Sequence, residues 1–211
     1  MKTKKMPTDI DAALIIMIKN PALGTAKTRL AATVGDQEAL RIYHLLLAHT
    51  RKVAIEANID TYLYYSDRIE DDEWPAAYFT KRIQADGDLG NRMRSAFAEV
   101  SQYHNKIIII GSDCAQLTSE HIRQAIISLN NYDVVMGPVH DGGYYLLGTK
   151  GHHPAIMTDI SWSTSSVVDQ TIQKTKENNL SYTTIETLSD IDYYDDWIKY
   201  GQKILDSQES R

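Results

Sequence analysis

Lys106-Ile107-Ile108-Ile109-Ile110-Gly111-Ser112-Asp113 is the stretch of this 211-residue chain that decides its fold. Four consecutive isoleucines between a lysine and a glycine are typical of a strand buried on both faces of a parallel sheet. Ligands bind beyond the carboxyl ends of strands in open α/β sheets, so Asp113 is expected at the mouth of a site. There its carboxylate can hold a hard divalent cation, which can in turn hold phosphates. The alternative role, helix N-cap, is better assigned to Thr118 or Ser119.

Composition narrows the class of protein. Hydrophobic residues make up 43% and charged residues 24% of the chain, as in a soluble globular protein with a real core. The formal net charge of −6 argues against duplex nucleic acid as a partner. The single cysteine, Cys114, fits a reducing cytoplasm and is expected to be structural rather than a nucleophile. The apolar run 12–18 is too short to span a membrane.

Strands and helices are expected to alternate along the whole chain. Apolar runs predict strands at 12–18, 59–65, 80–84, 106–110, 132–136 and 181–185. Helical spacing predicts helices at 37–57, from about 88 to 103, at 119–130, at 165–178 and after residue 192, with Asp36 and Thr164 as caps of the first and fourth. This alternation predicts an α/β fold of three layers, α/β/α, with a mostly parallel central sheet. We expect one domain at 12–206 between tails at 1–11 and 207–211.

A basic loop at 19–30 follows the first strand. Gly24 allows close backbone approach, and Lys27 and Arg29 can reach an oligophosphate, the arginine through a bidentate fork. The loop is not a Walker A motif, because Ala26 stands where the second glycine is required. The alternative is a basic surface loop that joins a strand to a helix.

Two further glycine-containing turns are candidates for ligand contacts. Gly87 and Asp88 precede a helix, which suits an anion or the sugar and base of a nucleotide, although Asp88 can equally cap that helix. The turn at 141–143 precedes an alternating aromatic and apolar run, which is also what an ordinary hairpin looks like. In a substrate site, Asp141 would take a proton and Tyr144 would stack or donate a hydrogen bond.

Two residues late in the chain complete the candidate site. Asp190 and Asp192 fall on one side of an extended segment, so both can face a metal. Alternatively, Asp192 complements the positive end of the last helix, as Asp195 and Asp196 are expected to do. Trp162 is either a lid or an anchor.

Six segments together resemble a family of bacterial nucleotide-diphospho-sugar transferase-like proteins with the glycosyltransferase A fold, over residues 13–197. The family is related to MobA-like and phospholactate guanylyltransferase-like nucleotidyltransferases. The matching segments are 19–30 (KNPALGTAKTRL), 87–93 (GDLGNRM), 111–117 (GSDCAQL), 137–148 (GPVHDGGYYLLG), 162–164 (WST) and 190–192 (DID). The chain departs from the pattern at Ala115-Gln116, where a proline is usual, and at Tyr193-Tyr194, where Thr-Pro often follows the aspartate.

The resemblance implies a role for each segment. The nucleotide would contact Lys19, Gly24, Lys27, Arg29, Gly87, Asp88 and Arg92. The second substrate would contact Gly142, Gly143, Tyr144 and Trp162. The metal, Mg²⁺ or Mn²⁺, would be held by Asp113 and by Asp192, with or without Asp190.

The expected function is a metal-dependent transferase that uses a nucleotide-activated donor and a small acceptor. We favour a glycosyltransferase, in which Asp141 is the base and Lys27 and Arg29 neutralise charge on the leaving group. The alternative is a nucleotidyltransferase that joins a nucleoside triphosphate to a phosphorylated small molecule and releases pyrophosphate. A third hypothesis is a non-catalytic nucleotide-binding module. Some of the 13 tyrosines can line an acceptor site or a homodimer face.

Overall fold

The computed structural model describes residues 11–201 and 203–205, so the expected tails, apart from Asp11, lie outside the described residues. The strands are β1 (Ala12–Ile18), β2 (Asp60–Tyr65), β3 (Phe79–Ile83), β4 (Lys106–Ile110), β5 (Val134–Pro138), β6 (Tyr144–Lys150) and β7 (Tyr182–Thr184). The helices are α1 (Thr28–Val34), α2 (Asp36–Ala57), α3 (Leu89–Val100), α4 (Ser119–Ser128), α5 (Val167–Glu177) and α6 (Tyr194–Asp196). A 3₁₀ turn (Pro154–Met157) and a π turn (Trp197–Gly201) complete the elements.

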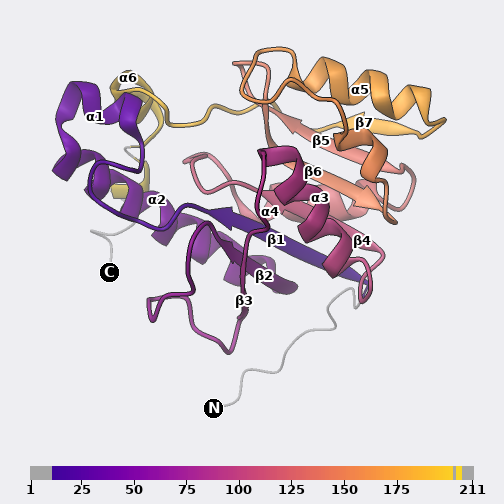
Figure 1. The fold of residues 1–211 in the computed structure, drawn as a ribbon, viewed down its shortest axis with the longest axis horizontal. Coiled ribbons are helices and arrows are strands. Elements are labelled where there is room, and N and C mark those ends of the chain that lie inside the picture. The colour runs from indigo at the N-terminus through magenta and orange to yellow at the C-terminus, as the bar shows by residue number, and fades with distance from the viewer. Residues whose placement is uncertain (1–10, 202, 206–211) are drawn as a thin grey trace.

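The seven strands form one sheet in the order β3-β2-β1-β4-β6-β5-β7 (Figure 1). Only β6 runs against its neighbours, β4 and β5, and the other four strand pairs are parallel. The prediction of a mostly parallel sheet is therefore confirmed.

The isoleucines of β4 show why the sheet is covered on both faces. Ile108 and Ile110 pack in a cluster with side chains of α2 and α4, whereas Ile107 and Ile109 pack in a second cluster with side chains of α3. Alternation along a strand sends successive side chains to opposite faces, so a run of four apolar residues needs a helical layer on each side. Figure 1 shows α3 on one face and α2 and α4 on the other, which confirms the three-layer arrangement.

The hairpin reading of the 141–143 turn is confirmed, because β5 and β6 pair antiparallel on either side of it. Gly142 has φ +92°, and a Cβ there would clash with the backbone of Ser165. The Gly142 carbonyl accepts from the amide of Val168, 3.0 Å away. The hairpin tip is thereby joined to the start of α5, and only glycine fits this approach.

Several local expectations were wrong. Helix α1 begins at Thr28, within the stretch 19–30 that was expected to be a loop, and continues to Val34. Gly35 rather than Asp36 precedes α2, and Ser166 rather than Thr164 precedes α5. Thr118 does cap α4, through a capping box with His121. Strand β5 begins at Val134, two residues later than expected, because Tyr132 still bonds to the end of the preceding helix at Ser128.

No helix within residues 11–201 and 203–205 is long and apolar enough to cross a membrane.

Candidate functional site

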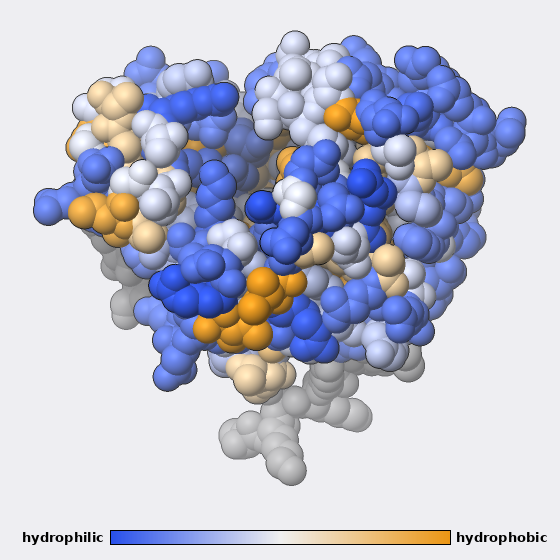
Figure 2. All heavy atoms as spheres, viewed as in Figure 1, coloured by the Kyte–Doolittle hydropathy of each residue, from blue (hydrophilic) through white to orange (hydrophobic). Residues whose placement is uncertain are grey.

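A cavity of about 550 Å³ opens beyond the carboxyl ends of β1 and β4. A second hollow of about 440 Å³ adjoins it, and Asp113, Asp190 and Asp192 line both. Figure 2 shows a largely hydrophilic face that is hollowed between the part carrying α1 and α6 and the part carrying α5. The position agrees with the rule for ligand sites in open α/β sheets.

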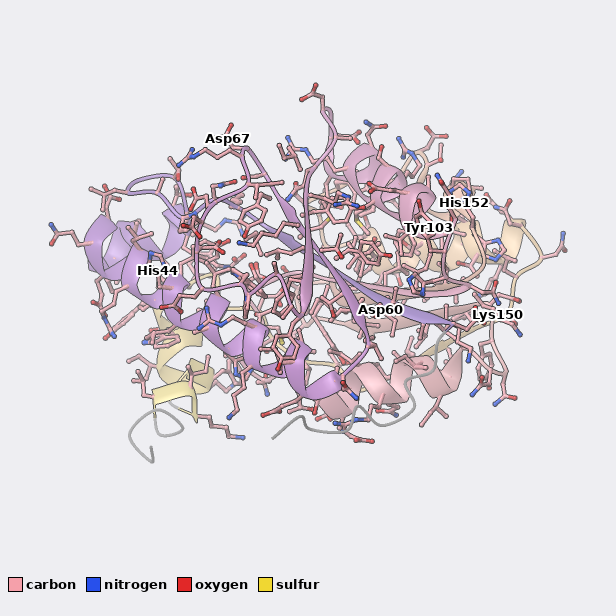
Figure 3. The ribbon with its side chains drawn as sticks, turned by 90° about the horizontal axis from the view of Figure 1, so that it is seen from below. His44, Asp60, Asp67, Tyr103, Lys150 and His152 are labelled. Carbon is pink, nitrogen blue, oxygen red and sulfur yellow. The ribbon has the colours of Figure 1, made fainter. Side chains whose placement is uncertain are left out.

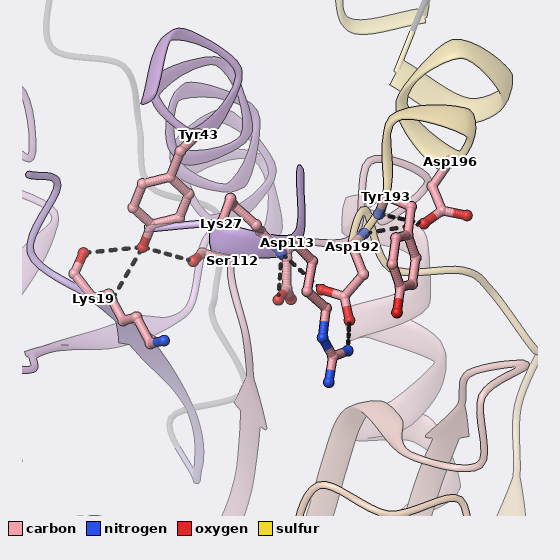
Figure 4. Close-up of polar contacts among 9 residues, drawn as sticks. Lys19, Lys27, Tyr43, Ser112, Asp113, Asp192, Tyr193 and Asp196 are labelled. Carbon is pink, nitrogen blue, oxygen red and sulfur yellow. Dashed lines mark hydrogen bonds and ion pairs between the residues drawn. The ribbon is translucent and has the colours of Figure 1, made fainter. Parts of the chain in front are cut away.

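Two carboxylates and two cations meet at the centre of this cavity (Figure 4). Lys27 Nζ lies 3.0 Å from Asp113 Oδ2 and 3.4 Å from Asp192 Oδ1. Arg29 donates to the other oxygen of Asp192 at 2.8 Å. The Lys27 side chain is only 9% exposed, whereas those of Asp113 and Asp192 are 38% and 33% exposed. The ammonium is therefore enclosed between carboxylates that still face the cavity.

Charge pairing keeps this central group ionised. Burial alone would lower the pKa of Lys27, but Asp113 and Asp192 outweigh it and raise that pKa above its ordinary value. Burial would raise the pKa of Asp113, but the Lys27 ammonium beside it holds that pKa below its usual range. Both partners are thus charged near neutral pH.

Backbone geometry explains how three distant segments deliver these groups. Lys27 has φ 52° and ψ 47°, a left-handed conformation uncommon outside glycine, and it stands at the N-terminus of α1. The amide of Ile191 donates to the Asp113 carbonyl at 2.9 Å, which ties the late segment to the end of β4. Asp196 Oδ2 accepts from the amides of Asp192 and Tyr193 at 3.1 and 2.8 Å, which fixes Asp192 at the start of α6.

Asp190 differs from Asp192 although both line the cavity. Its Oδ1 is buried and has no hydrogen-bond partner within the described residues. Burial, reinforced by the charge of Asp113, raises the pKa of Asp190 well above its ordinary value. The two aspartates of the late segment thus differ in their surroundings: Asp192 is paired with Lys27 and Arg29, whereas Asp190 is buried and its Oδ1 is unpaired within the described residues.

The other expected nucleotide contacts divide into two groups. Lys19 and Arg92 line the cavity, but Gly24 and Gly87 are not among its lining residues. Asp88 caps α3, where its side chain accepts from the amide of Asn91 at 2.7 Å. The structure therefore favours the capping interpretation of Asp88.

The expected residues of the second substrate gather at the adjoining hollow. Asp141, Gly143, Tyr144 and Trp162 all line it. Asp141 Oδ1 accepts from the amide of Gly143 at 2.9 Å and so braces the hairpin turn. Tyr144 and Trp162 meet edge to face, with ring centroids 6.3 Å apart. Gly142 is absent from this lining and serves the turn.

The lining of the main cavity also includes residues that were not singled out from the sequence, among them Tyr43, Ser112 and Gln84. Tyr43 and Ser112 lie beside Lys19 and Asp113 (Figure 4), and Gln84 is fixed on the wall. Gln84 Nε2 donates to the carbonyls of Ile18 and Tyr64, at 2.9 and 3.0 Å. Ser112 was visible next to Asp113, but Tyr43 lies in an amphipathic helix with no distinguishing signal.

Cys114 is buried, and burial raises the pKa of its thiol. A thiol held in its neutral form is a poor nucleophile, in agreement with the structural role expected for it.

The donor set fits a hard divalent cation. Asp113, Asp192 and the unpaired Asp190 Oδ1 offer oxygen ligands of the type that Mg²⁺ and Mn²⁺ take. In the described part of the chain, no three His, Cys, Asp or Glu residues form a ready cluster for a metal. His44 and His152 lie at opposite ends of the molecule (Figure 3). The residues therefore suit a cation that brings phosphate and water ligands with it, as Mg²⁺ usually does, rather than a closed protein cage.

Comparison with known proteins places this fold among nucleotide-diphospho-sugar transferase-like proteins. A solved structure described as a candidate nucleotide-diphospho-sugar transferase of Desulfovibrio desulfuricans G20 is 26% identical, with a TM-score of 0.80 over 87% of this chain and 83% of that one. The 2-phospho-L-lactate guanylyltransferase of Methanocaldococcus vulcanius is 25% identical over 80% of this chain and 74% of its own length. A manganese complex of a Mycobacterium tuberculosis H37Rv protein shares the fold at 12% identity, with a TM-score of 0.52 over 92% of this chain and 98% of that one.

A sequence profile described as "Uncharacterized protein conserved in bacteria (DUF2064)" matches residues 48–164, more than half of the chain. The chain therefore belongs to the DUF2064 family. The expected glycosyltransferase A fold and the expected enzyme class, a transferase, are both confirmed by the relatives.

Proposed function

We propose that the protein is a divalent-cation-dependent nucleotidyltransferase, which transfers a nucleoside monophosphate from a triphosphate to the phosphate of a small acidic molecule. The observation that carries the proposal is the convergence of Lys27 and Arg29 with Asp113 and Asp192 at the carboxyl edge of the sheet. Cations beside cavity-facing carboxylates suit an oligophosphate that arrives with a metal ion.

The residues of the adjoining hollow favour nucleotidyl over glycosyl transfer. In an inverting sugar transfer the hydroxyl acceptor needs a base, and one oxygen of the expected base, Asp141, is already engaged by the amide of Gly143 in the hairpin turn. An acceptor phosphate is already anionic and needs no base. The name of the Methanocaldococcus relative, a guanylyltransferase acting on 2-phospho-L-lactate, supports the same reaction and a phosphorylated hydroxy acid as acceptor.

In the proposed reaction an oxygen of the acceptor phosphate attacks the α-phosphorus, the bond to the β-phosphate breaks, and pyrophosphate leaves. Lys27 and Arg29 would stabilise the charge that develops on pyrophosphate. Asp113 and Asp192 would hold the cation, Mg²⁺ or Mn²⁺, and Asp190 would be an additional ligand. When bound, the cation would neutralise phosphate charge and orient the donor. Lys19 and Arg92 would contact the nucleotide, while Tyr144 and Trp162 would enclose the acceptor.

Glycosyl transfer is the second candidate, because the Desulfovibrio relative is described as a nucleotide-diphospho-sugar transferase.

One assay distinguishes nucleotidyl transfer from glycosyl transfer. The purified chain is incubated with each nucleoside triphosphate and 2-phospho-L-lactate or other phosphorylated hydroxy acids, with Mg²⁺ or Mn²⁺, and pyrophosphate is measured. Parallel reactions contain nucleotide sugars, and nucleoside diphosphate is measured. Acceptor-dependent pyrophosphate release would support our proposal, and release of nucleoside diphosphate alone would replace it with glycosyl transfer.

A further inference from the structure

We propose that Lys27 is a resident counter-ion that keeps the metal position closed until an oligophosphate arrives, so that the site takes the metal–oligophosphate complex and binds the free cation poorly. The inference rests on the metal assignment made under the proposed function, but it concerns how the site is filled rather than which reaction follows.

The geometry of the central group carries the first step. One ammonium nitrogen contacts both proposed metal ligands, at 3.0 Å from Asp113 and 3.4 Å from Asp192. Mg²⁺ requires its oxygen ligands at about 2.0–2.1 Å, so a cation that bridges the same two oxygens would need the volume that Nζ now fills. Ammonium and metal are therefore alternative occupants of one position.

The enclosure of Lys27 carries the second step. With its side chain 9% exposed and its backbone held in a left-handed conformation, Lys27 has little room to move its ammonium into solvent. Displacing it without another anion would leave a buried charge unpaired, which is strongly unfavourable. Two costs therefore oppose binding of free Mg²⁺ or Mn²⁺: the Lys27 ammonium must be displaced, and the cation must lose part of its hydration shell.

An oligophosphate removes this obstacle. Lys19, Arg29 and Arg92 line the same cavity, so an anion drawn there would meet the Lys27 ammonium. Once phosphate oxygens accept the ammonium, the two carboxylates would be free to hold the cation, which would neutralise charge on those phosphates. A metal complex of a nucleoside triphosphate has a net charge near −2 and matches the cations of the cavity. Metal and oligophosphate should thus strengthen each other's binding reciprocally.

The test measures Mn²⁺ binding to the free protein by electron paramagnetic resonance, with no nucleotide present. Lys27→Met keeps the length of the side chain and removes the ammonium, so it should bind Mn²⁺ at least about tenfold more tightly than wild type. Lys150→Met is the matched control, because Lys150 is an exposed cation at the end of β6 that does not line the cavity and lies at the end of the molecule opposite His44 of α2 (Figure 3). Its affinity should stay within about threefold of wild type. Equal affinity in Lys27→Met and wild type, or equal gains in both variants, would overturn the inference.

A second measurement needs no substitution. In ¹⁵N-lysine-labelled wild type, the enclosed Lys27 ammonium should give a slowly exchanging NMR signal that disappears or shifts when Mg²⁺ and inorganic triphosphate are added together. Mg²⁺ that saturates the protein while this signal stays in place would contradict the exchange. Metal-dependent turnover with an unchanged Lys27→Met affinity would sink the inference and spare the proposed function. Tighter Mn²⁺ binding by Lys27→Met, together with no turnover by the wild type, would support the inference and refute the proposed function.

Discussion

The phenol of Tyr43 forms hydrogen bonds with both the backbone amide and the backbone carbonyl of Lys19. Its oxygen accepts from the Lys19 amide at 3.0 Å and donates to the Lys19 carbonyl at 2.9 Å. The same oxygen lies 3.5 Å from the hydroxyl of Ser112, the neighbour of Asp113. One side chain of α2 therefore joins the end of β1, where the basic segment begins, to the end of β4, where the cavity carboxylate stands (Figure 4).

Tyr43→Phe should lower the free energy of unfolding by about 1–2 kcal/mol, because two hydrogen bonds between the partly buried phenol and the Lys19 backbone are lost. It should also weaken nucleotide binding, since the start of the basic segment is no longer fixed. Urea denaturation and calorimetric titration measure the two effects. Tyr103→Phe is the control, because Tyr103 is 70% exposed and lies at the opposite end of the molecule from His44, the α2 residue next to Tyr43 (Figure 3). Similar losses in both variants would refute the anchoring role.

Asp113→Asn should abolish metal-dependent turnover, with a fall of about 100-fold or more, because the amide is neutral and a weaker ligand for a hard cation. Asp195→Asn removes an equal charge from an exposed position of α6 and should leave the rate within about twofold of wild type. Initial rates at saturating Mg²⁺ measure both. Full activity in Asp113→Asn would remove the central carboxylate from the proposed mechanism.

The fold could be predicted because its main signals are local. Four isoleucines in β4 require cover on both faces, and that requirement alone implies a layer of helices on each side. The α1 helix was missed because its N-cap is Lys27, and a left-handed backbone at a non-glycine residue has no marker in the sequence. Thr164 was the natural choice for a cap, but its hydroxyl donates to the Ser161 carbonyl instead, at 2.7 Å.

The carboxylates of the candidate site were found in the sequence, but their ion-pair partners were not. Spacing placed Asp190 and Asp192 on one side of an extended segment, and both do line the cavity. Which of them is ion-paired depends on Lys27 and Arg29, more than 160 positions earlier in the chain. Such a long-range pairing leaves no periodic trace in the sequence. Tyr43 was invisible for the same reason, since its function depends on residues of β1 and β4.

Acid stability should depend on Asp72, which accepts from Lys81 at 2.7 Å, from the Tyr65 hydroxyl at 2.7 Å and from the Trp74 amide at 3.1 Å. Burial alone would raise the pKa of Asp72, but these donors hold it below its ordinary value. The ionised carboxylate therefore stabilises the folded state above the unfolded pKa, near 4, and this contribution is lost as the pH falls through the lower folded pKa.

Asp72→Asn should consequently destabilise the protein at pH 7 by about 1–2 kcal/mol, and the difference from wild type should shrink steadily below pH 4. Urea denaturation at a series of pH values from 7 down to 3 measures this. Asp67→Asn is the control, because the Asp67 side chain is 68% exposed. A difference between Asp72→Asn and wild type that stays constant down to pH 3 would contradict the assignment.

The close contact between Gly90 and Trp162 shapes one wall of the proposed acceptor hollow. A Cβ at Gly90 would clash with the indole nitrogen of Trp162 and would lie 3.1 Å from the carbonyl oxygen of Met157. Gly90→Ala should therefore cost about 1–3 kcal/mol in unfolding free energy, despite the better helix propensity of alanine, and should shift the tryptophan fluorescence. It should also weaken acceptor binding, because Trp162 lines that hollow.

The double variant Gly90→Ala/Trp162→Leu separates a local clash from a general loss of helix packing. If the indole is what the new methyl group meets, removing it should recover part of the stability lost in Gly90→Ala, so the two single effects will not add. Thermal unfolding of the wild type, both single variants and the double variant gives the coupling energy. If the two single changes in unfolding free energy simply add, the new methyl group clashes with the Met157 carbonyl rather than with the indole. Trp162 would then be free to move as a lid.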